Sequence, residues 1–276
     1  MFTIRIFLGA IVFLQVLPIV QCLRCINNCP WITFPLNVSV PFDACQHDER
    51  ADGACSLSVE IDFKDQVTHG QLYMMKDSTT AYLTSRTHFS LETDSVKSLL
   101  IYLCGMSDYC GYGFLNELAT NKLVEFNYTN VYQKLRDLLY TSTGNETEIQ
   151  CFDRTCPSNS FCQVTLNTRM SPQLNDSEIY PNISCRTLFS NDSFLEVFET
   201  YLVPRHRFST MVMRCNTNQC GNNKTVLDVY NIFRNEFIIP MNYSILYMDN
   251  VVSISIRSNP SIFIYILLFL SIKLSF

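Results

Sequence analysis

The sequence is organised around one stretch, Leu23-Arg24-Cys25-Ile26-Asn27-Asn28-Cys29-Pro30, which returns in altered form as Ile149-Gln150-Cys151-Phe152-Asp153-Arg154-Thr155-Cys156-Pro157. In both copies an apolar residue stands two positions before a cysteine, and a Cys-Pro pair closes the stretch. Self-similarity of this kind indicates an internal repeat. We therefore expect two related cysteine-rich segments in one chain.

The two copies also close alike. The first runs Leu100-Ile101-Tyr102-Leu103-Cys104 and reaches Cys110-Gly111 five residues later, and the second runs Met211-Val212-Met213-Arg214-Cys215 and reaches Cys220-Gly221 after four. After each Cys-Gly pair, residues 130–139 and 225–234 carry apolar side chains along one helical face. The pattern predicts two tandem modules, and their different middle spacings indicate either that the copies have diverged or that their cysteines pair somewhat differently.

Strand-like patterns fill each copy. Residues 56–64 alternate polar and apolar, which predicts a strand with Leu57, Val59, Ile61 and Phe63 on one buried face. Residues 71–89 predict a hairpin with its turn near residues 76–78. The expected fold is mainly β with short helices, built from two tandem small disulfide-rich modules.

The N-terminal segment predicts export. Arg5 precedes an apolar run from Ile6 to Val20, which is the layout of a secretory signal peptide cleaved after Cys22. An uncleaved N-terminal anchor is the alternative, although the apolar run is short for a membrane span.

The C-terminal segment predicts a membrane anchor. Residues 260–276 are apolar and follow a short polar stretch with small residues, as in the signal for a glycosylphosphatidylinositol anchor. The candidate attachment residues are Ser253, Ser255, Ser258 and Asn259. A transmembrane helix is the alternative, but it would draw Arg257 toward the bilayer at an energetic cost.

The cysteine count favours structural disulfides. Of thirteen cysteines, Cys22 leaves with the signal peptide, and an even number remains for an oxidising compartment. The predicted disulfide cysteines are Cys25, Cys29, Cys45, Cys55, Cys104, Cys110, Cys151, Cys156, Cys162, Cys185, Cys215 and Cys220. Their connectivity stays open at this stage, because six cysteines per module allow many pairings.

Acceptor motifs for N-linked carbohydrate also fit an exported protein. The pattern Asn-x-Ser/Thr occurs at Asn37, Asn127, Asn145, Asn175, Asn182, Asn191, Asn223 and Asn242. Occupied motifs lie on the surface of secreted proteins. We therefore expect these eight positions to be exposed.

The resulting domain organisation has six parts. They are a signal peptide (1–22), cysteine-rich module 1 (23–114), a helical linker (115–148), cysteine-rich module 2 with its trailing helix (149–240), a membrane-proximal stalk (241–259) and a hydrophobic C-terminal tail (260–276).

Composition argues against several classes of function. The net charge is −5 and the basic residues are scattered, so no basic face for nucleic acid is expected. The four histidines are isolated and the cysteine spacings do not match a zinc site, so we predict no metal and no cofactor. No catalytic motif is recognised, and the polar cluster around His47 and Asp48 is interpreted as a solvated loop.

The opening Leu-x-Cys-x3-Cys-Pro, the closing cysteine loops, the tandem copies and the anchor signal resemble the urokinase-receptor-like three-finger family. The resemblance implies β-rich fingers that radiate from a disulfide palm formed by Cys25, Cys29, Cys104, Cys110 and their second-module counterparts. Such proteins are receptors, modulators or adhesion proteins. This chain departs from the family pattern, because it lacks the adjacent Cys-Cys pair and has glycine after Cys110 and Cys220.

The sequence thus predicts a non-enzymatic glycoprotein on the extracellular face of the plasma membrane, tethered by its C-terminal anchor. It is expected to bind an extracellular protein ligand, in adhesion or receptor modulation. Tyr109, Tyr112 and Phe114 are a candidate contact for a partner, or else pack the thin core. Two alternatives remain: a secreted hydrolase whose divergent site uses His47, Asp48 and a distant nucleophile, and a structural surface-coat glycoprotein.

Overall fold

The computed structural model describes residues 23–241, except for residues 40, 42, 44, 51–52, 77–80, 106, 120, 143–147, 159, 170–180, 188–192, 203–205 and 219. The predicted signal peptide and C-terminal tail lie outside the described residues, as do the four candidate attachment residues Ser253, Ser255, Ser258 and Asn259. The sequons at Asn145, Asn175, Asn191 and Asn242 also lie outside them.

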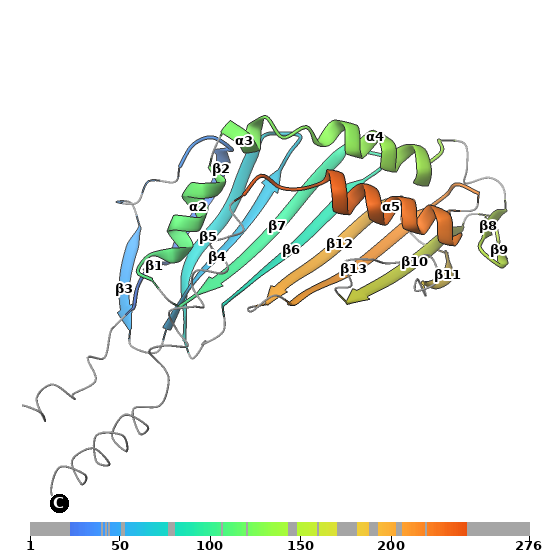
Figure 1. Ribbon diagram of the computed structural model, residues 1–276. Coiled ribbons are helices and arrows are strands. Elements are labelled where there is room, and N and C mark those ends of the chain that lie inside the picture. The colour runs from blue at the N-terminus through green and yellow to red at the C-terminus, as the bar shows by residue number, and fades with distance from the viewer. Residues whose placement is uncertain are drawn as a thin grey trace, which may run out of the picture.

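A nine-stranded antiparallel sheet forms the body of the molecule (Figure 1), in the order β11-β10-β13-β12-β6-β7-β4-β5-β2. The strands are β2 (Cys29–Pro35), β4 (Gly53–Asp62), β5 (Val67–Lys76), β6 (Tyr82–Ser90), β7 (Ser95–Cys104), β10 (Ser160–Arg169), β11 (Asn182–Thr187), β12 (Phe194–Leu202) and β13 (His206–Cys215). Two further pairs are β1 (Leu23–Asn27) with β3 (Gln46–Arg50), and β8 (Ile149–Cys151) with β9 (Arg154–Cys156). The mainly β, disulfide-rich fold class is confirmed.

The strand order repeats within the sheet. The first half contributes β5-β4-β7-β6 and the second half contributes β11-β10-β13-β12. The register repeats as well, because Cys55 lies opposite Cys104 in the first half and Cys162 lies opposite Cys215 in the second. Both halves therefore use one strand arrangement, while the domain boundaries given above stay predictions.

The two halves join edge to edge through β6 and β12. These strands pair antiparallel over nine residues, from Tyr82 opposite Leu202 to Ser90 opposite Phe194, with Arg86 and Phe198 at the centre. One continuous sheet results, because backbone hydrogen bonds between β6 and β12 connect the two cysteine-rich segments. We call this junction the β6–β12 seam.

The ninth strand, β2, belongs to the first half alone and pairs with β5. Trp31 of β2 lies opposite Gly70, where a Cβ atom would come within 2.4 Å of both the Trp31 ring and the Ser58 carbonyl oxygen. The Trp31 indole N–H donates to the Thr68 hydroxyl at 3.3 Å. Glycine at position 70 therefore lets the indole lie close against β5.

The hairpin that the sequence predicts over residues 71–89 is wrong. Strands β5 and β6 do form in this segment, but β4 and β7 lie between them in the sheet. Strands β4 and β7 bury more apolar side chains than β5 and β6, and they pair with each other through Cys55–Asp62 and Lys97–Cys104. They take the centre of the first half and leave β5 and β6 on either side.

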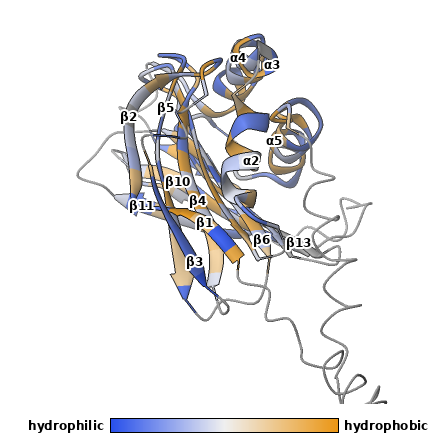
Figure 2. Cartoon of the chain, turned by 90° about the vertical axis from the view of Figure 1, so that its left-hand side faces the viewer, coloured by the Kyte–Doolittle hydropathy of each residue, from blue (hydrophilic) through white to orange (hydrophobic). Residues whose placement is uncertain are grey.

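Helices lie on one face of the sheet, and Figure 2 shows the two layers from the side. They are α2 (Cys110–Leu118), α3 (Asn121–Val124), α4 (Tyr128–Leu139) and α5 (Asn223–Glu236). The helices predicted at residues 130–139 and 225–234 are confirmed as α4 and α5. The predictions did not include α2, because its nine residues give only a brief apolar repeat.

The core lies between the helices and the sheet. Leu57, Val59 and Ile61 of β4 are fully buried and Phe63 is nearly so, as the alternating pattern predicted. Val131, Leu135 and Leu139 of α4, with Val226, Val229, Tyr230 and Phe233 of α5, close the core from the other side. Each large apolar side chain buried here contributes about 1.5–3 kcal/mol relative to exposure.

In the described part of the chain, no helix combines the length and the apolar character that crossing a membrane requires.

Candidate binding face of the sheet

All twelve predicted cysteines form disulfides. The bonds are Cys25–Cys55, Cys29–Cys45, Cys104–Cys110, Cys151–Cys162, Cys156–Cys185 and Cys215–Cys220. The disulfide framework is therefore confirmed. The cysteines on the sheet strands share the side of Leu57, Val164 and Met213, because side chains alternate along a strand, so the bonds lie on the helix-bearing face.

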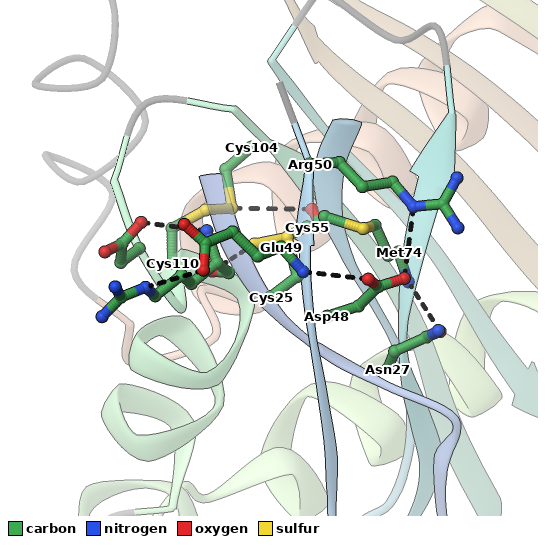
Figure 3. The surroundings of a disulfide bond; sticks show 11 residues. Cys25, Asn27, Asp48, Glu49, Arg50, Cys55, Met74, Cys104 and Cys110 are labelled. Carbon is green, nitrogen blue, oxygen red and sulfur yellow. Dashed lines mark hydrogen bonds and ion pairs between the residues drawn. A yellow bond between two sulfur atoms is a disulfide. The ribbon is translucent and has the colours of Figure 1, made fainter. Parts of the chain in front are cut away.

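The two halves repeat a paired arrangement of disulfides. Cys25–Cys55 lies beside Cys104–Cys110 (Figure 3), with the Cys104 Sγ 3.6 Å from the Cys55 carbonyl oxygen. In the second half, the Cys215 Sγ lies 3.4 Å from the Cys162 carbonyl oxygen. In each half, one bond ties an N-terminal strand to the sheet and its neighbour closes a short loop, which constrains the unfolded chain.

The remaining disulfide differs between the halves. Cys29 bonds Cys45, which lies just before β3, whereas its counterpart Cys156 bonds Cys185 on β11. The reason is an insertion, because β2 and β3 occupy the interval before Cys55 and nothing comparable precedes Cys162. Of the two alternatives that the spacing left open, different pairing therefore holds at this one bond.

Three buried sulfur atoms, those of Cys162, Cys215 and Cys220, lie within 4.8 Å of one another. Metal binding by cysteine requires the thiolate form. All three atoms are bonded in disulfides, so in the oxidised protein they are part of the framework and supply no thiolate ligand.

The polar cluster around His47 and Asp48 lies on strand β3 and not on a loop tip. Figure 3 shows Asp48, Glu49 and Arg50 of this strand. The Asp48 carboxylate accepts from Arg50 Nε at 3.2 Å and from the Glu49 backbone N–H at 2.9 Å. The His47 and Tyr109 rings lie nearly perpendicular to each other, with their centroids 5.6 Å apart. Successive strand residues point to opposite sides, so the strand does not bring the His47 and Asp48 side chains together.

The opposite face of the sheet, which we call the open face, bears a mixed set of side chains. Leu195 and Val197 of β12 are buried toward the helices, so Phe194, Glu196 and Phe198 point the other way. Phe198 is 36% exposed, and its position opposite Arg86 puts it at the centre of the β6–β12 seam.

Charged groups cross the β6–β12 seam on this face. The Glu196 carboxylate accepts from Arg86 Nε at 2.7 Å and lies 3.7 Å from His88 Nδ1, and its side chain is only 13% exposed. The Arg86 guanidinium lies 5.1 Å from the centre of the Phe198 ring, and the Arg214 guanidinium lies 4.5 Å from the centre of Phe194. Stacked cation–π pairs of this kind hold both the rings and the cations in place.

A second set of charged side chains, Lys97 with Asp62 and Glu60, lies beside the set formed by Arg86, His88 and Glu196. Lys97 Nζ binds Asp62 at 3.0 Å and Glu60 at 3.5 Å. Burial raises the pKa of Asp62, but the backbone N–H of Asp65, the Lys97 ammonium and the backbone N–H of Lys64 outweigh it and hold that pKa below its ordinary value. The Asp62 carboxylate raises the pKa of Lys97 in return.

These groups surround a shallow hollow of about 350 Å³ on the open face. It is lined by Glu60, Arg86, His88, Lys97, Leu99, Phe194 and Glu196. The lining comes from β4, β6, β7 and β12, so the hollow straddles the β6–β12 seam and contains residues of both halves.

The described sequons lie away from the central strands of the open face, and Asn182 is on the edge strand β11. Asn37, Asn127, Asn182 and Asn223 are all exposed. Asn127 directly precedes α4 and Asn223 is the first residue of α5, so both lie at the ends of helices that cover the other face of the sheet. None of the eight sequons falls within the sequences of β4, β6, β7, β12 and β13. The central strands of the open face therefore carry no acceptor for carbohydrate.

The predicted aromatic contact near the first cystine loop belongs largely to the interior. Phe114 is buried and stacks on Tyr102 with ring centres 4.4 Å apart, and Tyr109 and Tyr112 pack partly buried against the core. Sequence reasoning missed the open face, because its residues come from strands of both halves that meet only at the β6–β12 seam. Residues 194–200 read Phe-Leu-Glu-Val-Phe-Glu-Thr and show no polar–apolar alternation that would have marked it.

No family model matches the chain, and neither a curated protein nor a solved structure matches it. The resemblance to three-finger proteins therefore stays a prediction.

Proposed function

We propose that this protein is a non-enzymatic glycoprotein, tethered to the extracellular face of the plasma membrane, that binds an extracellular protein through the open face of its sheet. Six disulfides suit an oxidising compartment. The four described sequons are exposed, as glycosylation requires.

The open face is the observation that carries the proposal. Aromatic residues and arginine are enriched at protein interfaces and dominate their binding energy. Phe198 and Arg86 stack at the centre of this face, and Leu99 and Phe194 lie near them beside the hollow. Carbohydrate on the sequons flanking the helices would cover the other face and leave the central strands accessible to a partner.

Anchorage and export are tested on cells that express the full chain. Treatment with phosphatidylinositol-specific phospholipase C is expected to release glycosylated protein into the medium. Protein that reaches the surface but resists the enzyme would favour a membrane-spanning segment, and protein retained inside the cell without carbohydrate would contradict the proposal.

Binding is tested with the released protein on an array of extracellular receptor domains. Phe198→Asp places a charge at the centre of the open face and is expected to abolish binding. Ile238→Asp is the matched control, because Ile238 is 54% exposed and lies after α5, outside the open face. Binding that survives Phe198→Asp, or the absence of any partner on a broad array, would count against this surface.

A further inference from the structure

The two edges of the sheet are built differently. The outer strand β2 carries Pro30 and Pro35, and its pairing with β5 shifts register between Trp31 and Phe34. Prolines and irregularities of this kind protect an edge, because they remove hydrogen-bond donors and bend the strand. At the other edge, β11 pairs with β10 in uninterrupted register over six residues and contains no proline.

The repeat explains why β11 is the last strand of the sheet among the described residues. Met74 of β5 lies opposite Cys55, and Cys185 of β11 lies opposite the equivalent Cys162, so β11 occupies the position of β5. In the first half, residues 30–54 supply the covering strand β2. In the second half, only residues 157–161 separate Cys156 from Cys162, and in the part of the chain that the structure describes no strand pairs with the outer side of β11.

An uncovered edge is a template for another strand. The outward-facing N–H and C=O groups of such a strand pair readily with a second chain. This protein already joins two four-stranded units edge to edge at the β6–β12 seam. A second copy of the chain could use β11 in the same antiparallel manner.

Asn182 is the first residue of β11, is exposed, and begins the sequon Asn182-Ile183-Ser184. Asn182 lies opposite Thr165, on the outermost strand of the sheet. We propose that N-linked carbohydrate on Asn182 covers the β11 edge, as β2 covers the edge of β5, and prevents edge-to-edge pairing of two copies. A hydrated, bulky glycan at this position would exclude a neighbouring strand sterically. The inference rests on the proposed export of the protein as a glycoprotein.

Ser184 offers a matched pair of tests, because both Ser184→Ala and Ser184→Lys destroy the sequon and retain Asn182. Alanine leaves the edge bare, whereas lysine is a residue that natural edge strands use to prevent pairing. The full chain is expressed in secretory cells and extracted in mild detergent. Glycopeptide mass spectrometry then gives the occupancy of Asn182, and light scattering over a range of concentrations gives the oligomeric state.

We expect an occupied Asn182 and a monomer for the wild type, concentration-dependent dimers for Ser184→Ala and Asn182→Gln, and a monomer for Ser184→Lys. Asn223→Gln, which removes the sequon at the start of α5, should stay monomeric. An unoccupied Asn182 in an exported monomer glycosylated elsewhere, or a monomeric Ser184→Ala at every concentration, would overturn this inference alone. A chain that is neither exported nor glycosylated would instead overturn the proposed function.

Discussion

Phe237 and Phe89 meet ring against ring, with centroids 5.0 Å apart and ring planes at 70°. Phe89 lies on β6 in the first half, whereas Phe237 directly follows α5 in the second. Phe63, Phe126 and Phe233 surround the Phe237 ring at centroid distances of 5.1–5.7 Å. This cluster is a second junction between the halves, formed by side chains on the helix-bearing face, in addition to the β6–β12 seam.

Replacing Phe237 by alanine should weaken this junction. Truncating a buried phenylalanine costs about 3–5 kcal/mol of unfolding free energy, because a cavity replaces the ring. Urea unfolding with the disulfides intact measures the effect. Ile238→Ala is the control, since its exposed side chain should contribute less than about 0.5 kcal/mol. Equal effects of the two substitutions would show that the cluster does not connect the halves.

Asn216 connects the end of β13 to the end of α4. Its buried side-chain amide accepts from the Thr141 backbone N–H at 2.8 Å and donates to the Thr141 carbonyl oxygen at 2.7 Å. The backbone N–H of Asn216 donates to the Leu139 carbonyl oxygen. Asn216→Asp keeps the acceptor but removes the donor, so it should cost about 1–3 kcal/mol. Asn231→Asp, on the exposed side of α5, is the control. Denaturant unfolding curves compare the two, and an unchanged midpoint for Asn216→Asp would contradict this role.

The glycines after Cys110 and Cys220 should differ in their tolerance of alanine. A Cβ on Gly221 would lie 2.8 Å from Cys162 Sγ, whereas the nearest atom to a Cβ on Gly111 is Leu72 Cδ2 at 3.4 Å. Forcing atoms into a packed site typically costs about 1–3 kcal/mol. Gly221→Ala should therefore lower thermal stability clearly and Gly111→Ala only slightly. Thermal unfolding of both variants checks the prediction, which fails if Gly111→Ala is the more damaging change.

The free energy of unfolding should fall at acidic pH, in part because Asp62 becomes protonated. Its pKa is lowered in the folded protein, so its contribution is present above the unfolded pKa of about 4 and is lost as the pH falls through the folded value. Asp62→Asn should reduce stability at pH 7 and flatten the decline below about pH 4. Asp65→Asn, at an exposed neighbouring position, is the control. The test is to measure the free energy of unfolding of the wild type and of both variants between pH 7 and about pH 3. If the stability of Asp62→Asn falls as steeply with pH as that of the wild type, the prediction is contradicted.

Features encoded over short distances were predicted well from the sequence. The alternation around Val59 and the helical spacing of Val131 and Leu135 reflect the geometry of single elements, and the structure confirms both. The pairing of strands was not predictable, because any strand can hydrogen-bond with any other. Which strands become neighbours, as β4 does for β5 and β7 for β6, depends on how the whole chain packs. The open face depends on the β6–β12 seam, so it could not be predicted before that pairing was known.

The β6–β12 seam also has a consequence for synthesis. Residues 82–90 leave the ribosome well before their partner, residues 194–202, has been made. At about 5–20 residues per second, this interval of about 100 residues lasts on the order of 5–20 s. During that time the nascent first half presents the unpaired edge of β6, which is open to aggregation, and a chain truncated before residue 194 would carry that edge permanently.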